Sequence, residues 1–119
     1  GVQTCALPIY RSVSVSGEAL RLLAIQPGDR IFTTSKFFFA YGIEHGLLGP
    51  LSLGATGVVL PDWAEPGTAL AAVAAHRPVA MFSVPSFYRR LLAEPAAVLE
   101  PLRAVRHFVA SCAASGRQE

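Results

Sequence analysis

The chain has 119 residues, of which 52% are hydrophobic and 15% are charged, and its formal net charge at pH 7 is +2. This length allows one domain at most, and the composition is too apolar for a disordered chain and too poor in charge for a nucleic-acid-binding protein. The sequence has no apolar run long enough to span a bilayer and no recognisable secretory signal, so we expect a cytoplasmic protein that does not bind a membrane.

Residues 1–9 read GVQTCALPI, which is the translation of one reading frame of a common sequencing-library adapter. We interpret these residues as an artefact and exclude them from the fold prediction, and a genuine N-terminal strand is the alternative. The chain also stops abruptly at Gln118–Glu119. We therefore expect residues 10–119 to be part of a domain that is truncated at both ends.

The predicted elements begin with a helix within Tyr10–Ile25, where leucine and alanine recur at the spacing of one helical face. A Pro-Gly-Asp turn at residues 27–29 follows, because proline presets φ and glycine can adopt positive φ. Next we predict a short strand at Arg30–Thr34, a loop at Ser35–Ala40 and a second helix at Tyr41–Leu53.

The second predicted helix contains Pro50, which cannot donate a backbone hydrogen bond, so we expect this proline to kink or divide the helix. Gly54 is well placed as the residue that ends it. The β-branched run Thr56–Leu60 predicts a buried strand. It is followed by a polar loop at Pro61–Gly67 and an alanine-rich helix at Thr68–His76.

The last part of the chain repeats the alternation of strand and helix. Val79–Ser83 predicts a strand, Pro85 starts a helix that runs to about Leu92, and His107–Ala110 predicts the final strand. Regular alternation of this kind indicates βα units, and continuous apolar strands suit a sheet covered on both faces. The predicted fold class is therefore α/β, a parallel sheet with flanking helices.

Ligands of open α/β sheets bind outside the carboxyl ends of the strands, so the loops after the strands matter most. These loops are Ser35–Tyr41, Pro61–Glu65, Val84–Tyr88 and the segment from Ser111 onward. The first contains three consecutive Phe residues followed by Ala, Tyr and Gly. One or two of these aromatic rings are expected to line an apolar slot, with Gly42 allowing close approach. The alternative is that all three Phe rings are core packing.

No sequence motif assigns a catalytic residue or a metal site. The patterns GxSxG, GxGxxG and GxxxxGK[ST] are absent, and neither Cys nor His residues have zinc-ligand spacing. Cys5 and Cys112 do not indicate a disulfide framework. His45 follows Glu44, but adjacent helix residues do not face each other, so we expect His45 to be exposed or to cap the helix.

Two segments carry a resemblance to a known family: KFFFAYGIEHGLLGPLSLGATGVVLPD at residues 36–62 and HRPVAMFSVPSFYRRLL at residues 76–92. They resemble the KLFFAYG-like, PLSVGAT-like and HRPT-to-GVPT-like segments of the benzoate–CoA ligase branch of the adenylate-forming (ANL) superfamily. The order and spacing agree across Ala24–Leu92. The resemblance implies that residues 10–119 are part of an AMP-binding N-terminal domain.

The resemblance also implies an activity, an ATP-dependent ligation of a carboxylic acid to CoA, with an aromatic acid such as benzoate or a substituted benzoate as substrate. An acyl-adenylate is the intermediate, and AMP and pyrophosphate are the products besides acyl-CoA. ATP, Mg²⁺ and CoA are the implied cofactors and small-molecule partners. By position, the acyl pocket of that branch corresponds to Ala40 and Tyr41, with Phe39 and Gly42 beside them.

Most catalytic motifs of the family fall outside this chain. Its phosphate loop would precede Tyr10, and its magnesium motif, ribose-binding Asp and catalytic Lys would follow Glu119, so we expect an inactive fragment with no catalytic residue and no metal site. Lys36 is not the catalytic Lys. After its last strand the family has Ser-Ala-Gly-Glu, which contacts the adenine side of the nucleotide. This chain departs from that motif after Ser111, either because the loop has diverged or because of a frame error. Ser111 is therefore the only nucleotide contact that the resemblance implies. The alternatives are an adenylation domain that loads a carrier protein and a non-catalytic α/β binding module. The oligomeric state stays open.

Overall fold

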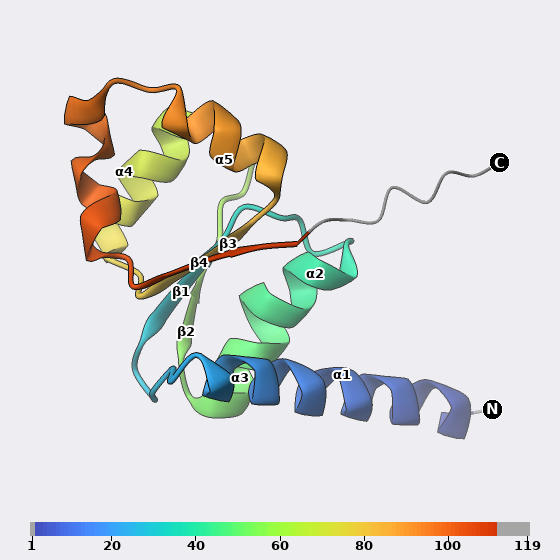
Figure 1. Ribbon diagram of the computed structural model, residues 1–119. Coiled ribbons are helices and arrows are strands. Elements are labelled where there is room, and N and C mark those ends of the chain that lie inside the picture. Colours follow the sequence, from blue (N-terminus) through green and yellow to red (C-terminus); the bar gives the residue numbers. More distant parts are fainter. Residues whose placement is uncertain (1, 112–119) are drawn as a thin grey trace, which may run out of the picture.

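The computed structural model describes residues 2–111, in which the strands form one parallel sheet (Figure 1). The strand order is β2-β1-β3-β4, and every neighbouring pair is parallel. The strands are β1 (Arg30–Thr33), β2 (Thr56–Val58), β3 (Ala80–Ser83) and β4 (His107–Ala110). The predicted fold class and the four predicted strands are confirmed, with β2 ending before Val59 rather than at Leu60.

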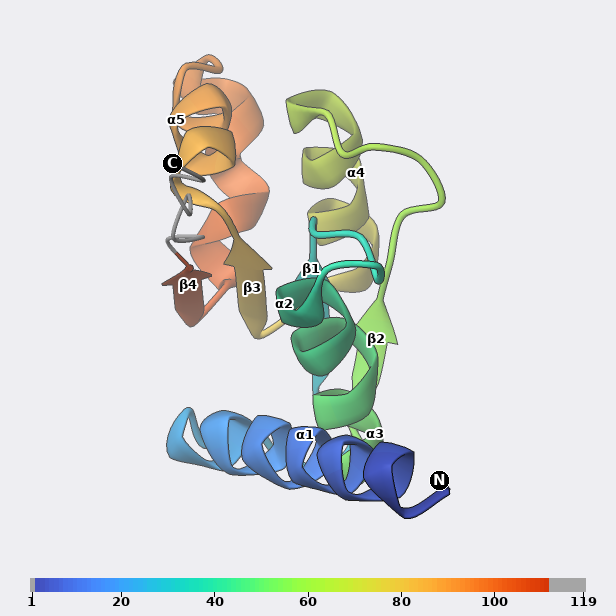
Figure 2. The ribbon, with the colours of Figure 1, turned by 90° about the vertical axis from the view of Figure 1, so that its right-hand side faces the viewer.

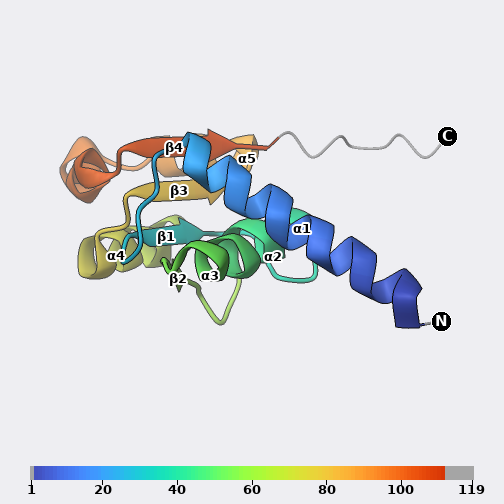
Figure 3. The same ribbon diagram turned by 90° about the horizontal axis from the view of Figure 1, so that it is seen from below.

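Helical segments cover both faces of the sheet (Figures 1 and 2). One face carries the first three helices and a π-helical segment, and the other carries two α-helices and a 3₁₀ helix. The first group is α1 (Val2–Leu22), α2 (Ala40–Ile43), η1 (Glu44–Leu48) and α3 (Gly49–Leu53). The second group is α4 (Pro66–His76), α5 (Pro85–Leu92) and η2 (Ala96–Ala104). Seen from below, α1 crosses the sheet beside α3 (Figure 3).

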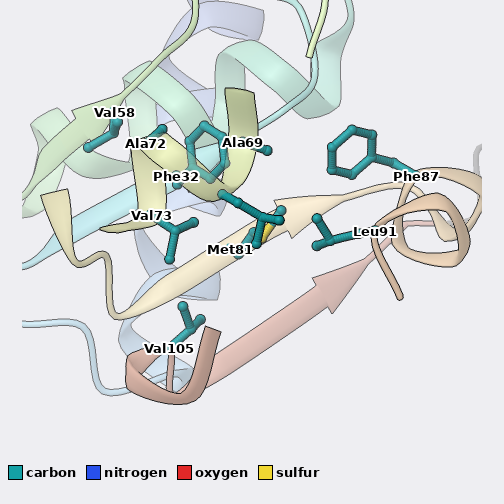
Figure 4. Packing of buried hydrophobic residues seen from close by; sticks show 10 residues of the cluster. Phe32, Val58, Ala69, Ala72, Val73, Met81, Phe87, Leu91 and Val105 are labelled. Carbon is teal, nitrogen blue, oxygen red and sulfur yellow. The ribbon is translucent and has the colours of Figure 1, made fainter. Parts of the chain in front are cut away.

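The core consists of two clusters separated by the sheet, because alternate strand residues point to opposite faces. Phe32 and Met81 face α4 and α5, where side chains of both helices gather around them (Figure 4). Ile31 and Phe82, their neighbours in the strands, pack on the opposite face with Leu20 of α1. Burial on both faces explains why the strands are continuous apolar runs.

Helix α1 is longer than the sequence predicted. The structure places residues 2–22 in one helix, so it starts earlier and ends earlier than the predicted Tyr10–Ile25. The alternative of an N-terminal strand in residues 1–9 is wrong for residues 2–9, which are helical. The adapter interpretation of residues 1–9 stays a prediction, which the genomic sequence upstream of this segment would test. Within residues 2–111, no helix combines the length and the apolar character that crossing a bilayer requires.

The second predicted helix is divided at Pro50, as expected. The π-helical segment η1 comes first, and Pro50 lies in the first turn of α3. The carbonyl oxygen of Gly46 is the i−4 acceptor that Pro50 cannot use. This oxygen lies against Gly57 of β2. A Cβ atom added at Gly57 would lie 2.2 Å from it, so only glycine fits at this position. Gly54 ends α3 with φ of 70°, the left-handed conformation that glycine adopts without strain.

Candidate functional site

The order of the strands opens a crevice between β1 and β3. From β1 the chain crosses to β2 through α2, η1 and α3 on one face, whereas from β3 it crosses to β4 through α5 and η2 on the other face. The loops that leave the carboxyl ends of β1 and β3 therefore diverge. A crevice at such a point is the usual ligand site of an open α/β sheet.

A cavity of about 420 Å³ lies at this point. All four loops that the sequence singled out contribute to its wall. The lining residues are Thr34, Ser35, Lys36, Phe39, Ala40, Tyr41, Trp63, Ala64, Val84, Ser86, Phe87, Arg90 and Ser111. The volume lies within the range of pockets that bind small molecules, and most of the wall is apolar.

The predicted substrate residues divide into two groups. Phe39, Ala40 and Tyr41 line the cavity, whereas Gly42 does not. The alternative that the Phe residues of this loop are core packing is wrong, because Phe37, Phe38 and Phe39 are 37%, 71% and 53% exposed. Only Phe39 of the three lines the cavity, and its neighbours lie at a smaller adjoining hollow.

Gly42 is buried and permits close approach, but the approaching group is the chain's own backbone. A Cβ at this position would lie 2.1 Å from the carbonyl oxygen of Lys36 and 2.9 Å from that of Ser35. The absence of a side chain lets α2 start directly against the loop that follows β1. Gly42 thus helps to place Ala40 and Tyr41 rather than lining the cavity itself.

Tyr41 is fixed by hydrogen bonds to the ends of two strands. Its hydroxyl lies 3.2 Å from the carbonyl oxygen of Ser83 and 3.1 Å from that of Val109. Burial raises the pKa of Tyr41 to about 12, although backbone contacts with Ser111 and Ser83 act in the opposite direction. The side chain is therefore a neutral hydrogen-bond donor at physiological pH, and it lines the cavity.

His45 supports Tyr41 and is half-buried, so the expectation of an exposed position is wrong. Its ring centroid lies 4.9 Å from that of Tyr41 and 4.6 Å from that of Phe82. Its Nδ1 atom lies 3.1 Å from the carbonyl oxygen of Tyr41, four residues earlier on the same helical segment. The reason sequence reasoning missed this packing is that it depends on β3, which lies far along the chain.

Ser111 lies at the cavity wall, immediately after β4. Its backbone N–H donates to the carbonyl oxygen of Ser83 at 3.3 Å, which continues the pairing of β3 with β4 by one residue. The departure from the family pattern concerns residues 112–119, which lie outside the described residues. The structure thus places Ser111 at the site without describing the loop that follows it.

Sequence reasoning singled out the loops after β2 and β3 but assigned none of their residues to the cavity wall. Trp63 and Ala64 reach it from the loop after β2, and Phe87 and Arg90 reach it from α5. Arg90 forms an ion pair with Glu65 and lies 5.9 Å from the ring of Phe87. Trp63 could have been found from sequence, because it is the only Trp and stands in a loop already assigned to the ligand end.

Among residues 2–111, no group of three or more His, Cys, Asp or Glu side chains is placed to hold a metal ion. The polar groups at the cavity are instead hydroxyls and cations. Thr34 and Ser83 hydroxyls hydrogen-bond to each other at 2.5 Å across β1 and β3, and Lys36 and Arg90 supply positive charge at the rim. The arrangement suits a small organic molecule with a flat apolar body.

A parallel sheet with a cavity at its switch point is the arrangement found in ligand-binding domains of the open α/β class. Comparison with known families assigns it further: the profile described as AMP-binding enzyme matches residues 5–118. Because this match spans nearly the whole chain, the chain belongs to the AMP-binding enzyme family.

Two curated relatives and one solved structure illustrate the similarity. The chain is 44% identical over 103 residues to the 3-hydroxybenzoate–CoA/4-hydroxybenzoate–CoA ligase of Thauera aromatica, a match covering 86% of this chain and 20% of that protein. It is 44% identical over 87 residues to the 3-hydroxybenzoate–CoA ligase of Aromatoleum sp. (strain CIB), a match that covers 73% of this chain and 17% of that protein. A benzoate CoA ligase structure from Burkholderia xenovorans LB400 matches with a TM-score of 0.67 and 26% sequence identity. This match covers 81% of this chain and 24% of that one.

These similarities confirm the resemblance to the benzoate–CoA ligase-like branch of the adenylate-forming enzymes. The chain spans about a fifth of the length of the curated relatives it matches. The segment that it covers holds the cavity between β1 and β3, on which the proposals below depend.

Proposed function

We propose that the protein containing this chain is an ATP-dependent ligase that joins an aromatic carboxylic acid to CoA. The carboxylate oxygen attacks the α-phosphorus of ATP and expels pyrophosphate, giving an acyl-adenylate. The thiol sulfur of CoA then attacks the acyl carbon and expels AMP, and the thiol proton leaves to solvent. The names of the relatives and the membership of the AMP-binding enzyme family support this reaction.

The observation that carries the proposal is the apolar cavity with Phe39, Ala40 and Tyr41 in its wall. Aromatic walls favour a flat aromatic ring, because edge-on and offset ring contacts add about 0.5–1.5 kcal/mol beyond the burial of area. The small side chain of Ala40 leaves room between the two larger neighbours. We therefore assign Phe39, Ala40 and Tyr41 to the acid, with Gly42 as the residue that positions them.

The nucleotide and the metal involve other parts of the protein. We assign Ser111 to the nucleotide side of the cavity, on its position after β4. Residues 2–111 do not offer a cluster of three or more His, Cys, Asp or Glu side chains for a metal ion, so we assign the groups that would hold Mg²⁺ to other parts of the protein. ATP and CoA are cytoplasmic metabolites, which supports a cytoplasmic location. Residues 10–119 would then be one part of a larger AMP-binding N-terminal domain.

The test is the variant Ala40→Leu in the full-length protein, with acid-dependent exchange of pyrophosphate into ATP measured for benzoate and for ring-substituted benzoates. The larger side chain fills space beside Tyr41, so we expect the preference to shift toward the smallest acid by about tenfold or more.

The matched control for that test is Ala71→Leu, the same change on the exposed surface of α4, away from the cavity. It should leave the preference unchanged. A substrate profile that is the same in Ala40→Leu as in the wild type would contradict the assignment of this wall to the acid. Absence of exchange with every aromatic acid in the wild type would contradict the proposed function.

A further inference from the structure

Lys36 joins the loop after β1 to the loop after β2. Its Nζ atom donates to the carbonyl oxygens of Leu60 and Pro61, both at 3.2 Å, and to that of Asp62. An ammonium group has three N–H donors, so these three carbonyls use its whole donor capacity. The acceptors are consecutive residues of a single loop, and that loop carries Trp63 as its next residue.

The ammonium of Lys36 is balanced by dipoles and by an aromatic ring rather than by a carboxylate. None of the ion pairs formed within residues 2–111 involves Lys36. Its Nζ atom lies 5.6 Å from the centroid of the Trp63 ring, within the range in which a cation is attracted to a ring face. Lys36 is the only Lys in the chain. Its contacts therefore fix the place of this loop and of the indole ring.

Trp63 depends on such contacts, because it has no place in the core. The side chain is 66% exposed, and besides Lys36 its ring contact is an edge-on approach to Phe38 with centroids 5.9 Å apart. It nevertheless lines the cavity from the β2 side. Tyr41 lines the same cavity while bonded to the ends of β3 and β4. The two aromatic residues thus reach the cavity from segments that follow different strands, Trp63 after β2 and Tyr41 after β1.

We propose that Trp63 is a specificity-determining residue for the acid and that Lys36 is its positioning residue, an inference that rests on the proposed function. The indole ring limits how far a ring-bearing acid extends toward β2. The Lys36 ammonium holds the residues of the β2 loop that directly precede Trp63, so that the ring keeps this position. Lys36 has no donor left for a phosphate or a carboxylate, so its role is in the shape of the cavity.

The experiment uses the full-length protein with Trp63→Leu, Lys36→Met and the double variant. The readout is kcat/KM in pyrophosphate exchange for benzoate and for 3- and 4-substituted benzoates. Trp63→Leu should shift the ratio of these values toward the larger acids by about two- to tenfold, the size of one ring contact. Lys36→Met should shift the ratio in the same direction, because the loop is released.

The double variant separates a positioning role from independent effects. If Lys36 acts only through Trp63, then Lys36→Met adds nothing to the selectivity of Trp63→Leu, whereas independent residues give multiplied effects. Lys36→Arg, which keeps the charge and several donors, should retain most of the wild-type selectivity. The control Arg89→Met removes an exposed cation of α5 that does not line the cavity, and should change nothing. Melting temperatures identify variants that fail to fold. If Trp63→Leu or Lys36→Met fails to fold, the selectivities of Trp63→Phe and Lys36→Arg are compared with that of the wild type instead.

Two results would overturn the inference. One is a wild-type protein that activates aromatic acids while Trp63→Leu and Trp63→Phe leave the selectivity unchanged. The other is a pair of single-variant effects that multiply in the double variant. A wild-type protein without acid-dependent exchange would overturn the proposed function itself, so the two failures are distinguishable.

Discussion

At the scale of single residues, two tyrosines hold the end of the β3–β4 pair from opposite faces of the sheet. The hydroxyls of Tyr41 and Tyr88 lie 3.1 Å and 2.9 Å from the same carbonyl oxygen, that of Val109. Tyr88 also donates to Met81 at 2.8 Å. The carbonyl of Val109 precedes Ser111 by two residues, so these hydroxyls set where the chain leaves β4 and reaches the cavity.

The first prediction concerns the protonation of Tyr41. Burial raises the pKa of Tyr41 to about 12 from an ordinary value of 10.0, and burial raises the pKa of Tyr88 in the same direction. A raised pKa means that the folded protein holds the phenolic proton more tightly than the unfolded chain does. The stabilisation is therefore complete below pH 10 and is lost as the pH rises through about 12.

The measurement is the melting temperature of the full-length protein and of Tyr41→Phe from pH 8 to pH 12. At pH 8 the variant should be less stable by about 1 kcal/mol, the usual worth of one hydrogen bond. Phe has no proton to lose, so the two melting temperatures should converge above pH 10. A difference that stays constant across the whole range would show that Tyr41 does not titrate as the structure indicates.

Sequence reasoning assigned residues to one wall of the cavity and only loops to the other, for a physical reason. Phe39, Ala40 and Tyr41 follow β1 directly, so the end of the strand determines where they lie. Trp63 is separated from β2 by several loop residues, and its position depends on Lys36, which precedes it by many residues. A contact between two loops of this kind has no periodicity in the sequence that would reveal it.

At the scale of elements, the glycines of residues 40–53 let this helical stretch lie directly on its neighbours. A Cβ at Gly46 would meet the Cγ2 atom of Thr33 at 2.5 Å, and one at Gly49 would meet a methyl group of Leu20 at 2.7 Å. Gly42 approaches the loop after β1 in the same way. Close packing on β1 and α1 therefore sets the position of the whole stretch and of Tyr41 within it.

The second prediction tests this packing with Gly42→Ala in the full-length protein. Ala is the better helix former, but its Cβ would lie 2.1 Å from the carbonyl oxygen of Lys36. The loop backbone must shift, so we expect a loss of about 1–3 kcal/mol, measured as a lower midpoint of urea unfolding.

Gly67→Ala on α4 is the matched control for Gly42→Ala, because nothing lies within 4 Å of its added Cβ. This variant should be unchanged or more stable by up to about 1 kcal/mol. Equal behaviour of the two variants would contradict the packing argument. A gain of stability in Gly42→Ala would contradict it as well.

The strands and most helices could be predicted because local patterns determine them. The apolar runs, the starting proline of α5 and the final Gly54 are all signals within a few residues, whereas α4 starts at Pro66, inside the loop predicted at Pro61–Gly67. Two elements were missed. The 3₁₀ helix η2 contains Pro101 and has no buried residue, and it packs against the core only through partly buried side chains such as Leu99 and Leu102. The π-helical segment η1 depends on contacts with β1 and β2, which the local sequence does not encode.

At the scale of the whole molecule, the described segment provides a binding wall without the chemistry of the proposed reaction. Transfer to the α-phosphorus requires positive or hydrogen-bonding groups around the phosphate oxygens. Of the two cations at the cavity, Lys36 donates to three carbonyls and Arg90 is paired with Glu65. Within residues 2–111 the sheet edges are β2 and β4, and apolar side chains such as Phe108 are exposed on β4.

The last prediction follows from this separation of binding from catalysis. Purified residues 1–119, given an aromatic acid, ATP, Mg²⁺ and labelled pyrophosphate, should show no acid-dependent exchange above a blank without protein. They should also not hydrolyse ATP. The full-length protein under the same conditions should exchange, and Ala40→Leu in that protein should change which acids are used. If residues 1–119 alone gave measurable acid-dependent exchange, the groups that stabilise the phosphate would have to lie within this chain. Arg90 and Ser111, two of the polar residues at the cavity, would then be the first to substitute.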